Sequence, residues 1–190
     1  MPPSSRERLL DAAVDLLQRQ GYHGTGLNEL LERSEAPRGS LYHYFPGGKE
    51  QIGAEAIARA GEQVAAAVAH LLRSKPSPAD AVEALAGLLA AGLEASAFER
   101  GCPVATTALE VTPRSEPIRA AVESSFESWL APLRERLEAT GFTGEEAAQR
   151  ADLAIAALEG ALVLARARQN AGVLREAGRR LRPFLQPPED

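Results

Sequence analysis

The sequence predicts an all-α protein, and three observations support this prediction. Hydrophobic residues make up 45% of the chain and aromatic residues only 5%, so the core must be built mainly from Ala, Leu and Val. Apolar residues recur at helical spacing in most segments. Capping boxes, prolines and glycines separate these segments and mark helix starts and stops. The pattern accommodates about nine helices.

The first three helices are expected to be short and closely spaced. A capping box that begins at Ser4 starts a helix over about 5–20, and Thr25 is expected to cap the next one. Pro37 suits the first position of a third helix, and Pro46 ends it because its ring cannot continue the hydrogen-bond ladder. Two short helices around a tight turn are typical of a helix-turn-helix, whose second helix enters the DNA major groove.

The rest of the chain is predicted to form six further helices. A long helix follows the paired glycines after Pro46, and a second capping box, Thr143-x-x-Glu146, starts a later one. Prolines and glycines separate the others. The expected ranges are about 49–73, 79–97, 103–110, 117–140, 145–170 and 173–185.

The predicted third helix is rich in hydrogen-bond donors and rings. Arg38 can pair with guanine or a phosphate, and the aromatic residues can reach phosphates or thymine methyl groups. Thr25 and Lys49 lie at predicted helix starts, which favour binding of an anion, so both are added to the candidates. The alternative is a surface helix that buries Leu41 and Phe45 and turns its polar residues to water. The candidate DNA-binding residues are Thr25, Arg38, Gly39, Ser40, Tyr42, His43, Tyr44 and Lys49.

Charge and targeting signals limit the function classes. The net charge is −5, but the first 60 residues are close to neutral, and phosphate attraction depends on where the cations lie. A single cysteine cannot form an internal disulfide. The N-terminus lacks the apolar stretch of a signal peptide, and no apolar run is long enough to span a bilayer. We therefore expect a cytoplasmic protein.

No pattern in the sequence indicates catalysis, a metal or a cofactor. The three histidines have no ligand spacing between them, whereas a zinc site needs three or four converging donors. Neither a nucleophile elbow nor a phosphate-binding glycine loop is present. We expect no enzyme activity.

Two features admit both a functional and a structural interpretation. Cys102 lies at a predicted helix start, where a thiol can be acidified and act as a redox or electrophile sensor, but it can equally be a small buried residue. Phe126, Trp129 and Leu130 share a helix face that can be ordinary core or the wall of a pocket for an apolar, aromatic molecule.

The residues of the helix-turn-helix resemble a known family. Thr25, the run Arg38-Gly39-Ser40-Leu41-Tyr42, the pair Tyr44-Phe45 and Lys49 resemble the signature of the tetracycline-repressor-like (TetR) family of bacterial regulators. The segment 46–50, together with Gly101-Cys102-Pro103-Val104, resembles the branch of lincomycin- and flavonoid-responsive repressors. The third helix has the sequence Tyr42-His43-Tyr44-Phe45, whereas Tyr-x-His-Phe is frequent in the family. This difference concerns which operator bases the helix contacts, not whether it binds DNA.

The resemblance implies a two-domain, ligand-responsive regulator. Residues 1–48 would be the DNA-binding domain and 49–190 the ligand-binding and dimerisation domain. A dimer would bind a palindromic operator as a repressor, and a small apolar or aromatic effector would release it. The rival reading is a helical interaction protein that keeps the motif without operator function. The pocket residues implied are Leu89, Cys102, Thr106, Phe126, Trp129 and Leu130.

A stripe of mainly small apolar residues on the predicted helix over 145–170 is the candidate dimer face. Small residues at helical spacing let two helices approach closely, and the last helix extends the stripe. The alternative is that the stripe packs on the protein's own core. The residues are Ala151, Ala154, Leu158, Leu162, Ala165, Leu174 and Leu181.

Overall fold

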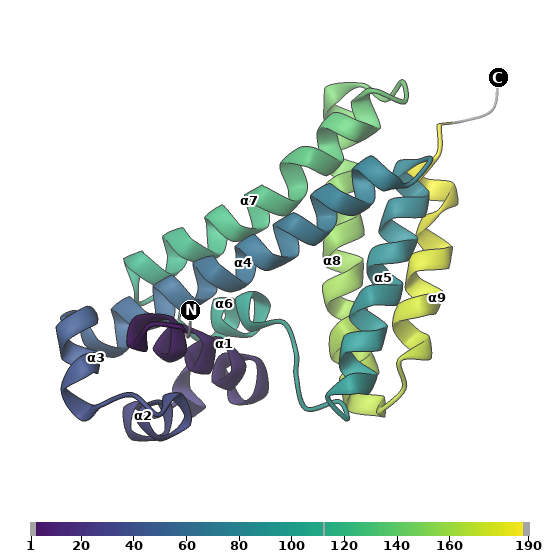
Figure 1. Cartoon of the computed structure of the whole chain (residues 1–190). Coiled ribbons are helices and arrows are strands. Elements are labelled where there is room, and N and C mark those ends of the chain that lie inside the picture. Colours follow the sequence, from purple (N-terminus) through teal and green to yellow (C-terminus); the bar gives the residue numbers. More distant parts are fainter. Residues whose placement is uncertain (1–2, 112, 188–190) are drawn as a thin grey trace. The chain divides into compact units, whose positions relative to one another are not determined.

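The computed structural model describes residues 3–111 and 113–187. Within these residues the chain forms nine α-helices and a short 3-10 turn, and no strand (Figure 1). The predicted all-α fold is confirmed. The helices are α1 (Ser5–Gly24), α2 (Leu27–Ser34), α3 (Arg38–Tyr44), α4 (Gly48–Ser74), α5 (Pro78–Ala95), α6 (Pro103–Val111), α7 (Glu116–Glu138), α8 (Gly144–Arg168) and α9 (Gly172–Leu181).

Local signals at the helix ends account for most of these boundaries. The Ser4 hydroxyl accepts from the Glu7 N–H at 3.2 Å, and the Glu7 carboxylate accepts from the Ser4 N–H at 2.7 Å. Thr143 and Glu146 form the same reciprocal pair at the start of α8. Both predicted capping boxes are therefore present. Only α9 is clearly shorter than expected, because Pro183 lacks an N–H and begins a 3-10 turn instead.

The helices group into two compact units. The first contains the residues up to Gln63 together with 102–126, and the second contains Val64–Gly101 and the residues from Glu127 onward. This division differs from the expected boundary between residues 48 and 49. The first half of α4 buries Ile52, Ala56 and Ile57 and so belongs with the helix-turn-helix, while α6 packs on α1. These associations are non-local and leave no mark in the sequence.

In the first unit, α2 and α3 pack on α1 (Figure 1). Leu9 and Leu16 of α1 are almost fully buried, as are Leu30 of α2 and Leu41 of α3. Phe45, directly after α3, is also completely buried. Burying a side chain of this size stabilises the fold by about 1.5–3 kcal/mol. These contacts therefore hold α2 and α3 on α1.

In the second unit, α5, α8 and α9 lie side by side (Figure 1). The contact between α5 and α9 is closest at Gly178 of α9. A Cβ atom on Gly178 would lie 2.6 Å from the Cβ of Ala86 and 3.2 Å from the Cα of Glu83. Only glycine lets the two helices approach this closely.

Ion pairs lie on both sides of this contact along α9. The Arg175 guanidinium binds both carboxylate oxygens of Glu94 at 2.9 and 2.7 Å. Arg182 binds Asp80 at 2.6 Å and Glu83 at 2.7 Å. Hydrogen bonds from Ser77 and Arg182 hold the pKa of Asp80 below its usual value. The pairs fix the register of α9 on α5.

Candidate nucleic-acid interface

The turn between α2 and α3 is built from two residues with specific backbone conformations and one side-chain hydrogen bond. Glu35 adopts the left-handed conformation (φ 51°, ψ 28°) and ends α2. The Ser34 hydroxyl accepts from the Ala36 N–H at 3.3 Å. Pro37 has an extended ψ of 139° and is the N-cap of α3. The helix therefore begins at Arg38, one residue later than predicted. The predicted helix-turn-helix is therefore present.

One face of α3 is buried and the other is open to solvent. Leu41 and Phe45 are completely buried, whereas Tyr42 exposes 64% of its surface. The His43 ring meets the Tyr44 ring edge to face, with 4.8 Å between centroids. Among the predicted DNA-binding residues of α3, exposed positions are Arg38, Gly39, Tyr42 and His43, and half-buried positions are Ser40 and Tyr44.

Arg38 differs from the nearby arginines of α1. It has no ion-pair partner among the residues that the structure describes. Arg6, in contrast, pairs with Glu55, and Arg8 donates to the carbonyl oxygen of Ser34 at 3.0 Å. Arg38 is consequently available to an external anion or base.

Thr25 does not cap α2 as predicted. Its side chain is 5% exposed, and its hydroxyl donates to the Gly21 carbonyl oxygen at 2.7 Å. Gly26 is the N-cap of α2 and contributes no side-chain hydrogen bond to the first turn. Amide groups at a helix start that are not capped by a side chain suit a phosphate oxygen.

Lys49 lies at the start of α4 and is half-buried. Its ammonium group is 4.6 Å from the centroid of the Tyr22 ring. Burial lowers the pKa of Lys49, and the negative charge of Glu110 opposes this effect. Burial also raises the pKa of Tyr22, with a contribution from the charge of Glu50.

The residues of the predicted effector pocket are divided between the two units. Leu89, Trp129 and Leu130 belong to the second unit, and the other three belong to the first. Trp129 is 2% exposed. The Sγ atom of Cys102 accepts from the Ala105 N–H at 3.4 Å, and the Thr106 hydroxyl donates to the Cys102 carbonyl at 2.9 Å. A shared pocket of these six residues stays a prediction.

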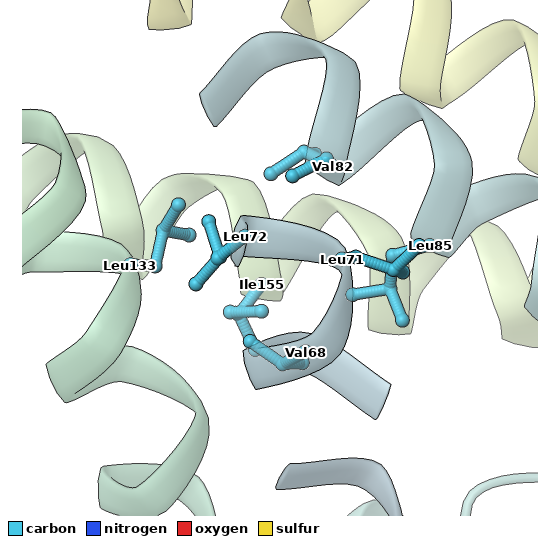
Figure 2. A pocket seen from close by; sticks show the side chains of 8 residues that line it. Val68, Leu71, Leu72, Val82, Leu85, Leu133 and Ile155 are labelled. Carbon is cyan, nitrogen blue, oxygen red and sulfur yellow. The ribbon is translucent and has the colours of Figure 1, made fainter. Parts of the chain in front are cut away.

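The second unit contains an apolar cavity of its own. Its free volume is only about 10 Å³, and Figure 2 shows its lining side chains, which come from α4, α5, α7 and α8. Sequence reasoning missed this site, because aliphatic residues at helical spacing look the same whether they fill or line a core. The lining residues are Val68, Leu71, Leu72, Ala81, Val82, Leu85, Leu133 and Ile155.

The residues of the predicted dimer face are inside the second unit. Ala151, Ala154, Leu158, Leu162, Ala165, Leu174 and Leu181 are each at most 9% exposed. They pack on the core of the single chain, as the alternative for this stripe has it, and a part for them in a dimer face stays a prediction.

A different face of α8 is exposed. Leu153 is 51% exposed and Val163 is 63% exposed. The face continues through small residues at alternating steps of three and four, and Leu164 lies beside it. We call the members of this face, together with the adjacent Leu164, the α8 stripe: Leu153, Ala156, Gly160, Val163, Ala167 and Leu164.

The described part of the chain lacks two kinds of feature. No cluster of three or more His, Cys, Asp or Glu side chains is placed to hold a metal ion there. Within the same residues, no helix has the length and apolar character needed to cross a membrane.

Comparisons with known protein families match both parts of the chain. Residues 9–56 match the family "Bacterial regulatory proteins, tetR family". Residues 78–180 match the family "Transcriptional regulator LmrA/YxaF-like, C-terminal domain". The HTH-type transcriptional regulator LmrA of Bacillus subtilis is 36% identical over 166 residues, which cover 87% of this chain and 88% of LmrA.

Solved structures of other regulators have the same fold. The reduced form of Escherichia coli NemR matches with a TM-score of 0.81 and 28% identity, over 95% of this chain and 97% of that one. A cysteine mutant of the regulator CifR, solved with a 26-bp double-strand operator DNA, matches with a TM-score of 0.79 and 29% identity, over 94% and 95% of the two chains. Both matches include the helix-turn-helix and the helices that follow it.

Proposed function

The chain belongs to the tetR family of bacterial transcriptional regulators, and we propose that it is a repressor that binds a palindromic operator as a dimer. A small apolar effector then releases it. The observation that carries the proposal is the two-sided character of α3 and its C-cap, which bury Leu41 and Phe45 and expose Arg38, Tyr42 and His43. The family consists of regulators and not of enzymes. Because bacterial DNA lies in the cytoplasm, the protein would act there.

The exposed residues of α3 have the chemistry that major-groove recognition needs. Arg38 can donate two hydrogen bonds to guanine O6 and N7, and Tyr42 and His43 can reach bases or phosphates. The uncapped first turn of α2 adds backbone donors for a phosphate. The operator complex of CifR supports this role by analogy, since that regulator shares the fold at 29% identity.

A gel shift with the DNA upstream of the chain's own gene tests the proposal. We expect retardation that a scrambled duplex of equal length does not compete away, and an affinity that falls steeply as salt rises. If neither this DNA nor any duplex selected from a random library is preferred, the alternative holds, in which a helical interaction protein keeps the motif without operator function.

The α8 stripe supports dimerisation. Leu153, Ala156, Gly160, Val163 and Ala167 follow the 3.5-residue period of a coiled-coil seam. The small members would let the same helix of a second copy approach closely. A two-fold dimer would place its two α3 helices about 34 Å or a small multiple of it apart, which implies a palindromic operator.

The apolar cavity of the second unit supports an apolar effector. Its free volume of about 10 Å³ is far below the about 300–1,000 Å³ of typical ligand pockets, so an effector would have to displace side chains to enter it. Val68, Leu71 and Leu72 of the lining belong to α4, which begins three residues after Phe45 and continues without a break to Ser74. A ligand that binds the DNA-incompetent state more tightly would shift the population away from the operator.

Filling the cavity should remove the effector response. We expect Val82→Phe to keep operator affinity and to lose release by aromatic compounds, with a flavonoid panel as the probe. Trp129 lies one turn before Leu133 of the cavity wall, so its fluorescence should change with every compound that releases the parent protein. Ala91→Phe, at an exposed position of the same helix, is the matched control. If aromatic compounds release Val82→Phe from the operator as they release the wild type, the effector site lies elsewhere.

A further inference from the structure

α1 is broken near its end. Gly21 has φ 73° and ψ −176°, values outside the helical region and within the range that favours glycine. In an unbroken helix the next two N–H groups would donate to carbonyl oxygens four residues earlier. Here the N–H groups of Tyr22 and His23 both donate to one carboxylate oxygen, Glu110 Oε2, at 2.7 and 3.0 Å.

The carboxylate of Glu110 sits directly on the broken turn. Glu110 is on α6, and 89 residues separate it from Gly21 in the sequence. A Cβ atom on Gly21 would lie 2.3 Å from Glu110 Oε1, so the contact also requires glycine. Hydrogen bonds to a charged group are roughly twice as strong as those between neutral groups. The pair of bonds is therefore a substantial local constraint.

The residues around the break are held on its other side as well. The Thr25 hydroxyl donates to the Gly21 carbonyl oxygen at 2.7 Å, and the Thr25 N–H donates to the Tyr22 carbonyl oxygen at 3.2 Å. The ammonium of Lys49 over the Tyr22 ring supplies positive charge near the Glu110 carboxylate. α2 begins two residues after Thr25, so the direction of this segment sets where α2 starts.

A second hydrogen bond ties the end of the same region to α4. The Ser115 hydroxyl, which is 6% exposed, donates to Glu50 Oε1 at 2.7 Å and accepts from the Ile118 N–H at 3.4 Å. Glu110 lies in the last turn of α6, and Ser115 directly precedes α7. The last turn of α6 is thus bonded to the end of α1, and the residue before α7 is bonded to the start of α4.

We propose that Glu110 is a positioning residue for DNA recognition, which fixes the direction in which α2 and α3 leave α1 by closing the break at Gly21. The proposal rests on the proposed function of α3. Contacts to phosphates tolerate a small reorientation of a helix, whereas hydrogen bonds to base edges do not. Loss of the Glu110 carboxylate should consequently reduce sequence preference more than it reduces general affinity for DNA.

The test compares two duplexes and one local probe. The first duplex is selected from a random library by the wild-type chain, and the second is its scrambled counterpart. We expect Glu110→Ala to weaken binding to the selected duplex by about tenfold or more, a ratio that corresponds to about 1.4 kcal/mol, while binding to the scrambled duplex stays within about twofold. Hydrogen exchange of the Tyr22 and His23 amides should accelerate by about tenfold.

Two further variants separate positioning from stability and from charge. Glu110→Gln keeps one acceptor oxygen and should give intermediate values; it decides the question alone if Glu110→Ala fails to fold. Glu116→Ala removes an equal charge from an exposed residue and should leave both readouts unchanged. Unchanged exchange of the two amides would show that Glu110 does not close the break at Gly21. Faster exchange with unchanged sequence preference overturns the positioning role alone. A wild-type chain without any preference overturns the proposed function and the positioning role with it.

Discussion

Replacing Gly160 and Val163 by glutamate is expected to give a folded monomer that has lost most of its operator affinity. Both positions are exposed in a single chain, and a side chain at Gly160 would meet nothing within 4 Å. Burying these carboxylates in an apolar seam between two copies is costly because they have no partner there. We expect the dimer dissociation constant to rise by about 100-fold, which corresponds to about 2.7 kcal/mol.

The effect on DNA follows from the loss of the second half-site. Two linked contacts can exceed the affinity of one by about 10²–10⁴-fold. Sedimentation at micromolar concentration should show the monomer, and the gel shift should weaken accordingly. Leu88→Glu, at another exposed apolar position in the second unit, is the matched control and should remain dimeric. A double variant that sediments as the wild type does would remove the α8 stripe from the interface.

Gly178→Val is expected to destabilise the second unit by about 3 kcal/mol, at the upper end of the usual cost of overpacking. The added side chain would have to enter the contact between α9 and the backbone of Glu83 on α5, where only 3.2 Å is available for a Cβ. Even Gly178→Ala should lower the free energy of unfolding, since its Cβ would meet Ala86 at 2.6 Å. Chemical denaturation measures both variants.

Gly87→Ala is the control for the same helix pair. A Cβ at this position of α5 would have no neighbour within 4 Å, so helix propensity alone should act and stabilise the protein by up to about 1 kcal/mol. The two alanine variants should therefore change the free energy of unfolding in opposite directions. A stabilising Gly178→Ala would show that α9 does not pack on α5 as closely as described.

Local signals in the sequence predicted most of the fold. The capping box at Ser4 and the arrangement of Pro37 and Pro46 act over a few residues, so the first three helices could be placed before the structure was known. The confirmed family membership rests on the same segment. The two-sided character of α3 also follows from sequence, because Leu41 and Phe45 alternate with polar residues at helical spacing.

Features that depend on distant contacts could not be predicted. α8 has apolar residues on more than one face, and Ala and Leu at helical spacing do not indicate which face turns inward; Ala154 is buried and Val163 is not. Thr25 has the residue type of an N-cap, but its hydroxyl is used by the carbonyl of Gly21. The bond between Glu110 and the end of α1 joins segments that no sequence pattern connects.

We propose that the exposed face of α3 gives the protein its preference for one DNA sequence. The variant Arg38→Ala/Tyr42→Ala removes two exposed side chains and should leave the buried anchors Leu41 and Phe45 in place. Each lost base or phosphate contact costs about 1–3 kcal/mol. Unfolding experiments on this variant should give a stability close to that of the wild type.

The most direct measurement is the ratio of affinities for a library-selected duplex and its scrambled counterpart, at one salt concentration, for the wild type and this variant. Specific sites are typically bound about 10³-fold or more tightly than non-specific DNA. We predict a ratio of that order for the wild type and a ratio that is lower by about 10–100-fold for the variant. An equal ratio for both proteins would contradict the assignment of α3 as the recognition helix.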